Sequence, residues 1–444
     1  MADLAELRQH AQQIFAAGVA AANPTLALNR FLSTEHDQLV IGLTNGAVRS
    51  HAWQKVHVIA FGKAAGLMAS AALARIPAQL LQLPVIAVTN YENSADYRNI
   101  ELLTAAHPLP DQAGLKAAQR IAERMSLVQK NELVLVLISG GGSALIPYPI
   151  NGISLAEKTQ VTELLLTSGA TINEINTVRK HLSVLKGGGL AKLAMPADLH
   201  ALILSDVLGD DLSAIASGPT VPDPTTYADA VALLHDKQLW PKLPRSVQNH
   251  LQHGVQGLIP ETPKPNDVIF ARTGHSLIGS NTVSLHAMQQ AASQLGYQTL
   301  IYQTQLQGEA KLEAEKLAAY AKTLNKPLAL IAGGETTVTV TGQGLGGRNQ
   351  EFALAFACAA SQYGLTSEWT LLSGGTDGRD GPTDAAGGLI DTCSISRMLT
   401  AGLNPLARLA DNDAYHALQS SGDLLLTGAT GTNVADLQVL LINT

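Results

Sequence analysis

The sequence predicts an α/β protein in which mostly parallel sheets are covered by helices on both faces. Short apolar runs alternate with segments of helical periodicity along nearly all of the 444 residues. Most of these runs, such as 133–138, are apolar throughout instead of alternating in polarity, which is typical of strands buried on both faces. The alternation of such strands with helices favours open, doubly wound sheets.

The runs of β-type composition define the expected strands. One run differs from the others, because residues 336–340 read Thr-Thr-Val-Thr-Val, an alternation that indicates an antiparallel or edge position. In chain order, the expected strands are Val56–Phe61, Val85–Thr89, Leu133–Ile138, Ala201–Ser205, Val268–Ala271, Thr299–Tyr302, Leu328–Ala332, Thr336–Thr341, Trp369–Ser373 and Asp423–Thr427.

Between these runs, apolar residues recur at the three- and four-residue intervals of helices with one buried face. The expected helices are Leu4–Ala21, Gly66–Ala74, Gln112–Ser126, Leu155–Ser168, Ile172–Ala194, Leu277–Leu295, Glu309–Thr323 and Asn349–Ala360. The region 237–267 contains five prolines and no strong strand pattern, so we expect it to separate two domains. These domains are residues 1–255, with a doubly wound, Rossmann-like sheet, and residues 256–444, with a mixed sheet.

Composition and charge exclude several classes of protein. An apolar fraction of 46% with 39 glycines is typical of a globular α/β enzyme and excludes a disordered or fibrous chain. The net charge of −7, without a run of basic residues, argues against a nucleic-acid partner. The longest apolar stretches have nine residues, too few to span a membrane. Cys358 and Cys393 make neither a zinc site nor a disulfide framework, so we expect a cytoplasmic protein.

In parallel α/β sheets, ligands bind at the carboxyl ends of the strands, so the loop after each expected strand is a candidate site. The strand 133–138 is followed by three glycines between two serines. Glycines let backbone amides approach an anion closely, which favours a phosphate or carboxylate site over a simple tight turn. The candidate residues are Ser139, Gly140, Gly141, Gly142 and Ser143.

A lysine follows the expected strand 56–61. Lys63 stands where a helix opens, and there its charge meets the positive end of the helix dipole. A bound anion would remove that penalty, although most single lysines are solvated surface residues. The loop is not a nucleotide-binding P-loop, because the GxxxxGK[ST] spacing is absent from the chain.

Carboxylates follow the expected strand 201–205. Asp206 stands at the strand tip, where it is a candidate ligand of Mg²⁺, an ion that takes one or two protein carboxylates together with phosphate oxygens. Asp210 and Asp211 are better explained as helix caps.

The second half of the chain repeats this arrangement. The loop at 374–384 contains four glycines and three carboxylates, of which Asp377 is the second candidate for a metal ion. A calcium-binding loop is the competing interpretation, but its characteristic ligand spacing is absent. The loop after the expected strand 328–332 supplies the further candidates Gly333, Gly334 and Glu335.

Residues 342–347 (Gly-Gln-Gly-Leu-Gly-Gly) match the glycine spacing of the dinucleotide-binding fingerprint. The context argues against that function, because the preceding strand alternates in polarity and Glu368 precedes the next strand instead of ending it. Arg348, at the helix start, adds a bidentate clamp for a phosphate or carboxylate. We therefore interpret the segment as an oxyanion-binding turn and not as a site for NAD.

Together these segments resemble the class II glycerate kinases, the family whose C-terminal part is called the MOFRL domain. The last motif departs from the family's pattern, since Ala429 and Ala435 replace Pro and Asn, a change expected to alter local loop geometry only. In the family's order, the matching motifs are FGKAA (61–65), HPLPD (107–111), ISGGGSAL (138–145), INTVRKHLSVLKGGGLA (175–191), SDVLGDD (205–211), SGPTVPDPTT (217–226), AGGETTVTV (332–340), GLGGRNQEFALA (344–355), SGGTDGRDGPTDAAGG (373–388) and TGATGTNVADL (427–437).

The resemblance implies two α/β domains with the active site in the cleft between them. The implied activity is ATP- and Mg²⁺-dependent phosphorylation of D-glycerate at its 2-hydroxyl, giving 2-phosphoglycerate and ADP. Relatives also carry the name hydroxypyruvate reductase, so an NAD(P)H-dependent reductase is an alternative, as is a non-catalytic sensor of sugar acids or nucleotides. The expected partners are D-glycerate and ATP, and a homo-oligomer stays open.

The resemblance singles out Lys63 and Arg348 most firmly. We expect them, one from each domain, to neutralise the transferring phosphoryl group and the glycerate carboxylate. Asp206 is expected to orient the glycerate hydroxyl or to hold Mg²⁺ through water, with Asp377 as the second candidate for the metal. The two glycine loops and Asn349 are expected to receive anionic and hydroxyl groups of substrate and nucleotide, with no assignment of loop to ligand.

Overall fold

The computed structural model describes residues 3–324 and 327–443, which form two compact units. One unit contains residues 27–278, and the other contains the chain before and after that segment. Within the described ranges, no helix is long and apolar enough to cross a membrane.

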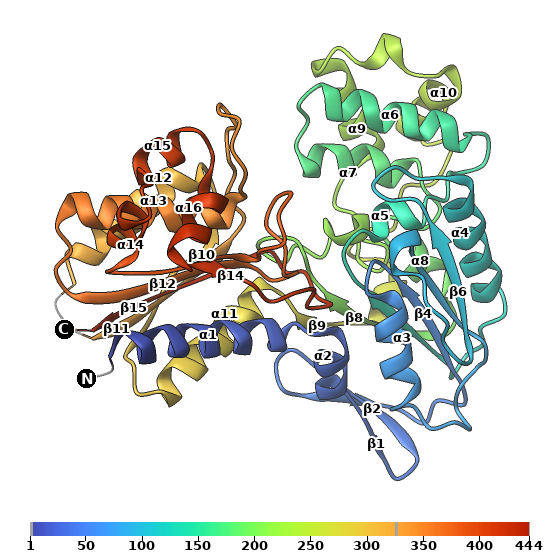
Figure 1. Ribbon diagram of the computed structural model, residues 1–444. Helices are drawn as coiled ribbons and strands as arrows, with labels where there is room; N and C mark the ends of the chain where they lie inside the picture. The colour runs from blue at the N-terminus through green and yellow to red at the C-terminus, as the bar shows by residue number, and fades with distance from the viewer. Residues whose placement is uncertain (1–2, 325–326, 444) are drawn as a thin grey trace. The chain divides into compact units, whose positions relative to one another are not determined.

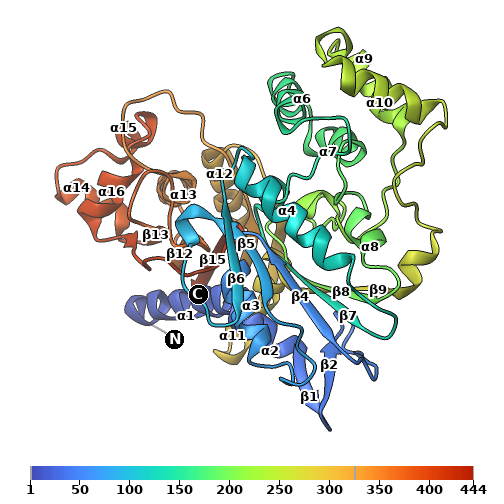
Figure 2. The same ribbon diagram turned by 90° about the vertical axis from the view of Figure 1, so that its right-hand side faces the viewer.

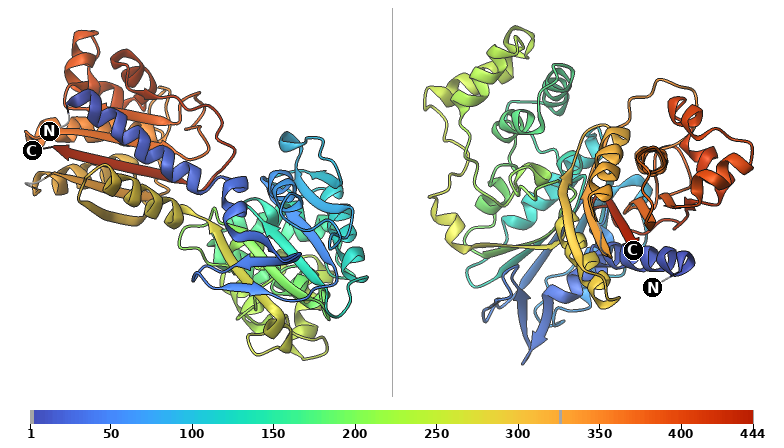
Figure 3. Two further views of the ribbon diagram at one scale, coloured as in Figure 1. Left: turned by 90° about the horizontal axis from the view of Figure 1, so that it is seen from below. Right: turned by 90° about the vertical axis from the view of Figure 1, so that its left-hand side faces the viewer.

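This division differs from the expected boundary between residues 255 and 256. The first helix, α1 (Leu4–Ala21), packs against α11 (Asn281–Gln294) and against the strands β12 (Glu368–Gly375) and β15 (Asp436–Asn443), as Figures 1 and 3 show. The chain therefore builds part of one unit, leaves it for about 250 residues, and returns at residue 279.

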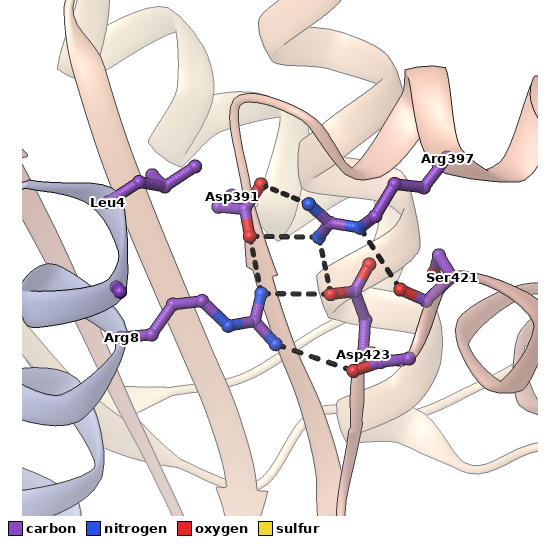
Figure 4. A pocket seen from close by; sticks show the side chains of 8 residues that line it. Leu4, Arg8, Asp391, Arg397, Ser421 and Asp423 are labelled. Atoms are coloured by element: carbon purple, nitrogen blue, oxygen red, sulfur yellow. Dashed lines mark hydrogen bonds and ion pairs between the residues drawn. The ribbon is translucent and has the colours of Figure 1, made fainter.

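Ion pairs join α1 to the distant C-terminal segment (Figure 4). The Arg8 guanidinium contacts the carboxylates of Asp391 and Asp423, the latter at 2.9 Å, and Arg397 contacts the same two carboxylates. Both carboxylates are buried. Because Arg8 lies 383 and 415 positions from these partners, local composition carries no sign of the contact.

The unit 27–278 is built on a six-stranded sheet with the order β6-β5-β4-β7-β8-β9 (Figure 2). The pairings from β6 to β8 are all parallel. Every residue of β4, β5 and β7 is buried, as expected for strands covered on both faces. The strands are β4 (Val56–Phe61), β5 (Val85–Asn90), β6 (Ile100–Ala105), β7 (Leu133–Ile138), β8 (Asp198–Leu204) and β9 (Thr273–Gly279).

Helices pack on this sheet and also form a separate cluster. α3 packs on β4 and β5, and residues of α4 and α8 share one apolar core with β4, β5, β7 and β8. A second core joins α6, α7, α9 and α10. The helices of this unit are α3 (Ala65–Leu73), α4 (Gln112–Met125), α5 (Gly142–Leu145), α6 (Leu155–Thr167), α7 (Ile172–His181), α8 (Gly189–Leu193), α9 (Tyr227–Asp236) and α10 (Arg245–Val255).

The remaining elements at the start of this unit are α2 (Pro24–Phe31) and an antiparallel meander of β1 (Leu32–Glu35), β2 (Gln38–Gly42) and β3 (Val48–Ser50). The sequence pattern did not predict the meander, because all three strands are short and the outer two, β1 and β3, are largely exposed.

The other unit has a mixed sheet with the order β10-β11-β15-β12-β13-β14. A mixed sheet confirms that part of the prediction, but a mostly parallel sheet was wrong here, since only β10 and β11 pair in parallel. The cause is β15, which lies between β11 and β12 and runs antiparallel to both. The other strands are β10 (Thr299–Leu306), β11 (Leu328–Gly334), β13 (Gly387–Asp391) and β14 (Leu424–Leu425).

Helices cover both faces of this sheet, as predicted. Alternate residues of β15 enter different cores: Val439 and Leu441 pack with α1 and α11, whereas Leu440 and Ile442 pack with α12 and α13 (Figure 1). The helices on the second face are α12 (Ala310–Lys322), α13 (Arg348–Tyr363), α14 (Ser394–Thr400), α15 (Pro405–Ala410) and α16 (Ala414–Ser421).

Four local predictions were wrong. Residues 268–272 form a 3₁₀ turn instead of a strand, and the following β9 occupies the first part of the expected helix 277–295. The expected strand 336–341 makes only one isolated bridge, at Thr337, because no strand lies beside it. Of the expected strand 423–427, only β14 forms.

The expected helix 172–194 is interrupted between α7 and α8. Gly187 and Gly188 there have φ values of +54° and +81°, a left-handed conformation that a continuous helix cannot contain. The interruption turns the residues of the INTVRKHLSVLKGGGLA motif in different directions.

Candidate active site

The parallel sheet has a topological switch point between β4 and β7. The chain proceeds from β4 through β5 to β6 on one side, and then from β7 to β8 on the other. Loops leave such a point in opposite directions, and ligands bind there in open α/β sheets. Two hydrogen bonds join the loops that follow the two strands: Lys63 N donates to Gly140 O at 2.9 Å, and Ala64 N donates to Ser139 Oγ at 3.1 Å.

The Lys63 side chain is exposed beside the glycine loop. A Cβ atom on Gly141 would lie 3.5 Å from Lys63 Cγ and 3.0 Å from the His107 ring, so glycine is needed for this close approach. Burial, together with the charge of Lys63, lowers the pKa of His107 and favours its neutral form. Within residues 3–324 and 327–443, Lys63 has no ion pair, so its charge is available to a ligand.

Asp206 follows β8 and its carboxylate lies against the same loop. A Cβ atom on Gly140 would lie 2.7 Å from Asp206 Cγ. The structure therefore brings together the predicted Lys63, the loop 139–143 and Asp206 at the carboxyl ends of β4, β7 and β8. Their roles in a reaction stay predictions.

Ser143 points toward residues that sequence reasoning missed. Lys186 Nζ donates to Ser143 O at 2.8 Å and to Ser143 Oγ at 2.9 Å. Ser143 Oγ also lies 2.9 Å from Ser217 Oγ, which donates to Asn176 Oδ1 at 2.8 Å. Asn176 and Lys186 belong to the INTVRKHLSVLKGGGLA motif and Ser217 opens SGPTVPDPTT, so the motifs themselves were the available signal.

In the other unit, Arg348 is held by two carboxylates. Its Nε and Nη2 donate to the two oxygens of Asp436 at 2.6 and 3.0 Å, and its Nη1 donates to Glu335 Oε1 at 2.7 Å. Burial lowers the pKa of the Arg348 guanidinium, but its bonds and charge contacts with Asp436 and Glu335 outweigh this and raise it overall. Arg348 thus stays charged. Its buried partner, Asp436, makes two hydrogen bonds with it, and its exposed partner, Glu335, makes one.

Asp436 was not among the predicted site residues. It stands at the start of β15, between Gly334 on β11 and Gly375 on β12. Burial raises the pKa of this carboxyl to about 6, against the lowering effect of Arg348. The TGATGTNVADL motif contains Asp436, but only the insertion of β15 into the sheet places it beside Arg348.

The predicted oxyanion-binding turn is already satisfied by oxygens of this chain. Backbone amides of residues 342–345 donate to Asp411, Asn412 and Asp413. The first free amides of α13, at Asn349 and Gln350, donate to Asp380 at 3.1 and 2.9 Å. These bonds disfavour the interpretation of this turn as a ligand site, because internal oxygens accept from the amides that a phosphate would need.

The other predicted residues of this unit differ in exposure. Asn349 is buried, and its Oδ1 accepts from Ser373 Oγ at 2.7 Å, so its side chain belongs to an internal network. Gly333 is buried against Asn281, whereas Glu335 is exposed beside Arg348. Asp377 is exposed, and its Oδ1 accepts from the Arg379 amide at 3.0 Å.

Hard oxygen donors suit Mg²⁺, and each predicted metal ligand is an exposed carboxylate. Asp206 and Asp377 stand at strand ends in different units. Among the residues that the structure describes, no group of three or more His, Cys, Asp or Glu side chains is placed to hold a metal. The donor set fits an ion that draws its remaining ligands from water and phosphate.

Comparison with known proteins identifies two family domains. A domain of unknown function, DUF4147, matches residues 10–252, and the MOFRL family matches residues 328–436. The two matched ranges contain the two groups of polar loops described above.

Full-length relatives include a glycerate 2-kinase of Pyrococcus horikoshii, 38% identical over 98% of both chains. A protein of Agrobacterium vitis that carries the name of a hydroxypyruvate reductase is 40% identical over 98% of this chain and 94% of that protein. A D-glycerate 2-kinase of Thermotoga maritima is 41% identical over 87% of this chain and 91% of its own length. A crystal structure of glycerate kinase from the same organism covers 98% of this chain and 99% of its own, with 38% identity and a TM-score of 0.86.

Proposed function

This chain belongs to the glycerate kinase family, and we propose that it transfers a phosphoryl group from ATP to the 2-hydroxyl of D-glycerate, giving 2-phosphoglycerate and ADP. The observation that carries the proposal is the set of unpaired cation, glycine amides and carboxylate at one topological switch point, formed by Lys63, the loop 139–143 and Asp206. The names of the full-length relatives support the same reaction.

Phosphoryl transfer needs alignment and charge neutralisation more than covalent catalysis. Lys63 supplies a positive charge that is not paired with a carboxylate among the residues that the structure describes, so no ion pair must break before a ligand binds. In the proposal it binds oxygens of the transferring group. Asp206 accepts a hydrogen bond from the glycerate hydroxyl and so orients it for attack.

Arg348 supplies the second positive charge. Asp436 is buried and bidentate, so it fixes the orientation of the guanidinium, whereas the Glu335 carboxylate is exposed and exchangeable. A substrate carboxylate or phosphate would take the place of Glu335 on Nη1. The proposal assigns Lys63 and Arg348 to the same reaction.

Mg²⁺ would be held by Asp206, with Asp377 as the alternative ligand, and ATP would supply further oxygens. When bound, the ion neutralises charge on the phosphate oxygens. This chain's part is to present an exposed carboxylate at the end of a rigid strand.

The name of the Agrobacterium vitis relative favours one alternative, an NAD(P)H-dependent reductase of hydroxypyruvate. The glycine segment 342–347 would have to bind the dinucleotide. Its amides donate to oxygens of Asp411, Asn412 and Asp413, which disfavours this function.

The test compares ADP release from ATP and Mg²⁺ in the presence and absence of D-glycerate with NADH oxidation in the presence of hydroxypyruvate. We expect ADP release that requires D-glycerate, a product whose NMR spectrum is that of 2-phosphoglycerate, and constant NADH absorbance. NADH oxidation without ADP release would contradict the kinase proposal and support the reductase function instead.

A further inference from the structure

Three basic side chains gather beneath the glycine loop of the unit 27–278. Lys158 comes from α6, Arg179 from α7, and Lys186 from the segment between α7 and α8. α7 packs against α6 and against the 3₁₀ turn 215–217, which in turn packs against α5 (Figure 1). The basic cluster, Lys158, Arg179 and Lys186, therefore comes from elements connected by contacts to α5, the helix that contains Ser143.

The cluster has donors without acceptors. Lys158 is 5% exposed, and its Nζ has no hydrogen-bond partner. Within the described part of the chain, neither a carboxylate nor any other acceptor pairs with the Arg179 guanidinium. Lys186 donates two bonds, both to Ser143, and keeps a third N–H. A buried donor without an acceptor costs free energy, so the chain does not supply the partner that the buried Lys158 ammonium needs. Arg179 is only half-buried, so its guanidinium also reaches solvent.

The charges of the cluster are also unbalanced. Burial, followed by the charge of Arg179, lowers the pKa of Lys158 to about 7. Burial, together with the charges of Lys158 and Arg179, lowers the pKa of Lys186 well below its ordinary value. An anion seated among the three side chains would reverse both effects, because an opposite charge favours the protonated lysines.

Neutral side chains hold Lys186 in place. Ser143 and Ser217 form a hydrogen-bonded chain that runs from Lys186 to Asn176. Because Ser217 donates to Asn176, Ser143 is left to donate to Ser217, so both hydroxyl groups are used within the chain. The lysines and the arginine therefore supply the donors and the charge for a bound oxyanion.

We propose that Lys158, Arg179 and Lys186 form a binding site for a phosphoryl group. A carboxylate carries one negative charge against three cationic groups, whereas a phosphoryl group carries about two and offers three acceptor oxygens, which fits the cluster better. The group belongs either to the nucleotide or to a phosphorylated hydroxy acid. This inference rests on the proposed kinase function and deepens it, since Ser143 ends the loop that approaches Lys63.

The test measures binding by calorimetry to the full chain and to Lys158→Met and Arg179→Met variants. The ligands are inorganic phosphate, ADP, 2-phosphoglycerate and D-glycerate. We expect at least one phosphate-bearing ligand to bind about tenfold more weakly or worse to both variants, as expected for loss of a hydrogen bond to a charged group. D-glycerate affinity should change less than about twofold.

Lys192→Met is the matched control, because it removes one positive charge from an exposed position on α8. It should leave all four affinities unchanged. Circular dichroism and the melting temperature identify variants that fail to fold, and Lys158→Gln then provides a second substitution that retains a polar end.

The outcomes separate the sources of the phosphoryl group. Weaker ADP binding alone assigns the cluster to the nucleotide, weaker 2-phosphoglycerate binding alone assigns it to the product, and loss of both assigns a shared position. Unchanged affinities, or weaker D-glycerate binding alone, would overturn the site. If the wild-type chain released no glycerate-dependent ADP, the kinase proposal would fail, but the phosphate titration would still decide the site.

Discussion

At the scale of single residues, Lys63 is the clearest case of a side chain whose charge is available to a ligand. We expect Lys63→Ala to lower kcat by at least about a hundredfold with folding intact, because removal of a preorganised charge costs this much transition-state stabilisation. Lys55→Ala is the matched control, since Lys55 is exposed at the opposite end of β4. Steady-state ADP release measures both. A Lys63→Ala variant with near-normal kcat would remove this residue from the mechanism.

Arg348 presents a different problem, because its removal leaves the buried Asp436 carboxylate without its cationic partner. We expect Arg348→Ala to lose about 3 kcal/mol of stability at neutral pH, as for other buried pairs broken on one side. The pKa of Asp436, already raised to about 6 by burial, would rise further in the variant. The loss of stability is therefore largest above the pKa of Asp436 in the variant, and it becomes smaller as the pH falls below that pKa, because the carboxyl is then neutral.

The double variant Arg348→Ala/Asp436→Asn separates folding from catalysis. It should regain most of the lost stability in urea unfolding, because the buried carboxylate that lost its cationic partner is replaced by a neutral amide. Its kcat should stay at least about a hundredfold below wild type. Recovery of kcat in the double variant would mean that Arg348 serves only to neutralise Asp436.

At the scale of elements, the entry into β15 depends on an unfavourable backbone conformation. Ala435 has φ of +67°, held by hydrogen bonds from Thr376 N and Oγ1 to its carbonyl at 3.0 and 2.6 Å. This is the position at which the resembled family carries asparagine, a residue that tolerates left-handed φ better than alanine.

We therefore expect Ala435→Gly to raise the free energy of unfolding by about 0.5 kcal/mol, the relief of strain exceeding the entropy of the added glycine. Gly431→Ala should act in the opposite sense by about 1 kcal/mol, because Gly431 has φ of +76° and no neighbouring atom within 4 Å of a new Cβ. Urea unfolding measures both variants. Changes of the same sign would contradict the assignment of strain to Ala435.

At the scale of the whole molecule, the first helix stabilises a unit formed mainly by the last third of the chain. Burial alone would raise the pKa of Asp391. The hydrogen bonds and charges of Arg397, the Cys393 amide and Arg8 lower it by a larger amount, so its pKa lies below the ordinary value. The stability from this network is therefore present above the ordinary carboxyl pKa of about 4 and is lost as pH falls through the lowered value.

We expect Arg8→Met to lower the melting temperature of that unit by about 4 °C at pH 7, for a loss of about 1.5 kcal/mol. The difference from wild type should vanish in acid below the lowered pKa of Asp391. Gln9→Met, an exposed substitution on the same helix, is the control in calorimetric scans. An equal shift at a pH low enough to protonate Asp391 would show that packing of Arg8, and not its charge, stabilises the helix.

The fold was predictable wherever one segment carries its own signal. Continuous apolar runs located β4, β7 and β11, and periodicity located α1 and α12, because burial on both faces or on one stripe dictates local composition. The Thr-Val alternation at 336–340 led to a wrong prediction of a strand. This segment makes only an isolated bridge, and a strand forms a ladder only when a second strand pairs with it.

The candidate site divides in the same way. The order of strands and loops sufficed to place Lys63, the loop 139–143 and Asp206 each after a strand. The parallel pairing of β4, β7 and β8 then brings them to one edge of the sheet. The sequence did not single out the buried Lys158, the half-buried Arg179 or Asp436 beside Arg348, since their importance depends on charge balance among residues far apart in the chain.

The sequence alone determined the α/β class, the family and the candidate loops for a site, because each is a property of contiguous residues. Only the tertiary structure decided that β15 enters the middle of the mixed sheet, that α1 joins the C-terminal unit, and that internal oxygens accept from the amides of the glycine turn at 342–347. Those outcomes depend on long-range pairing and on which buried charges find partners, quantities that local composition does not encode.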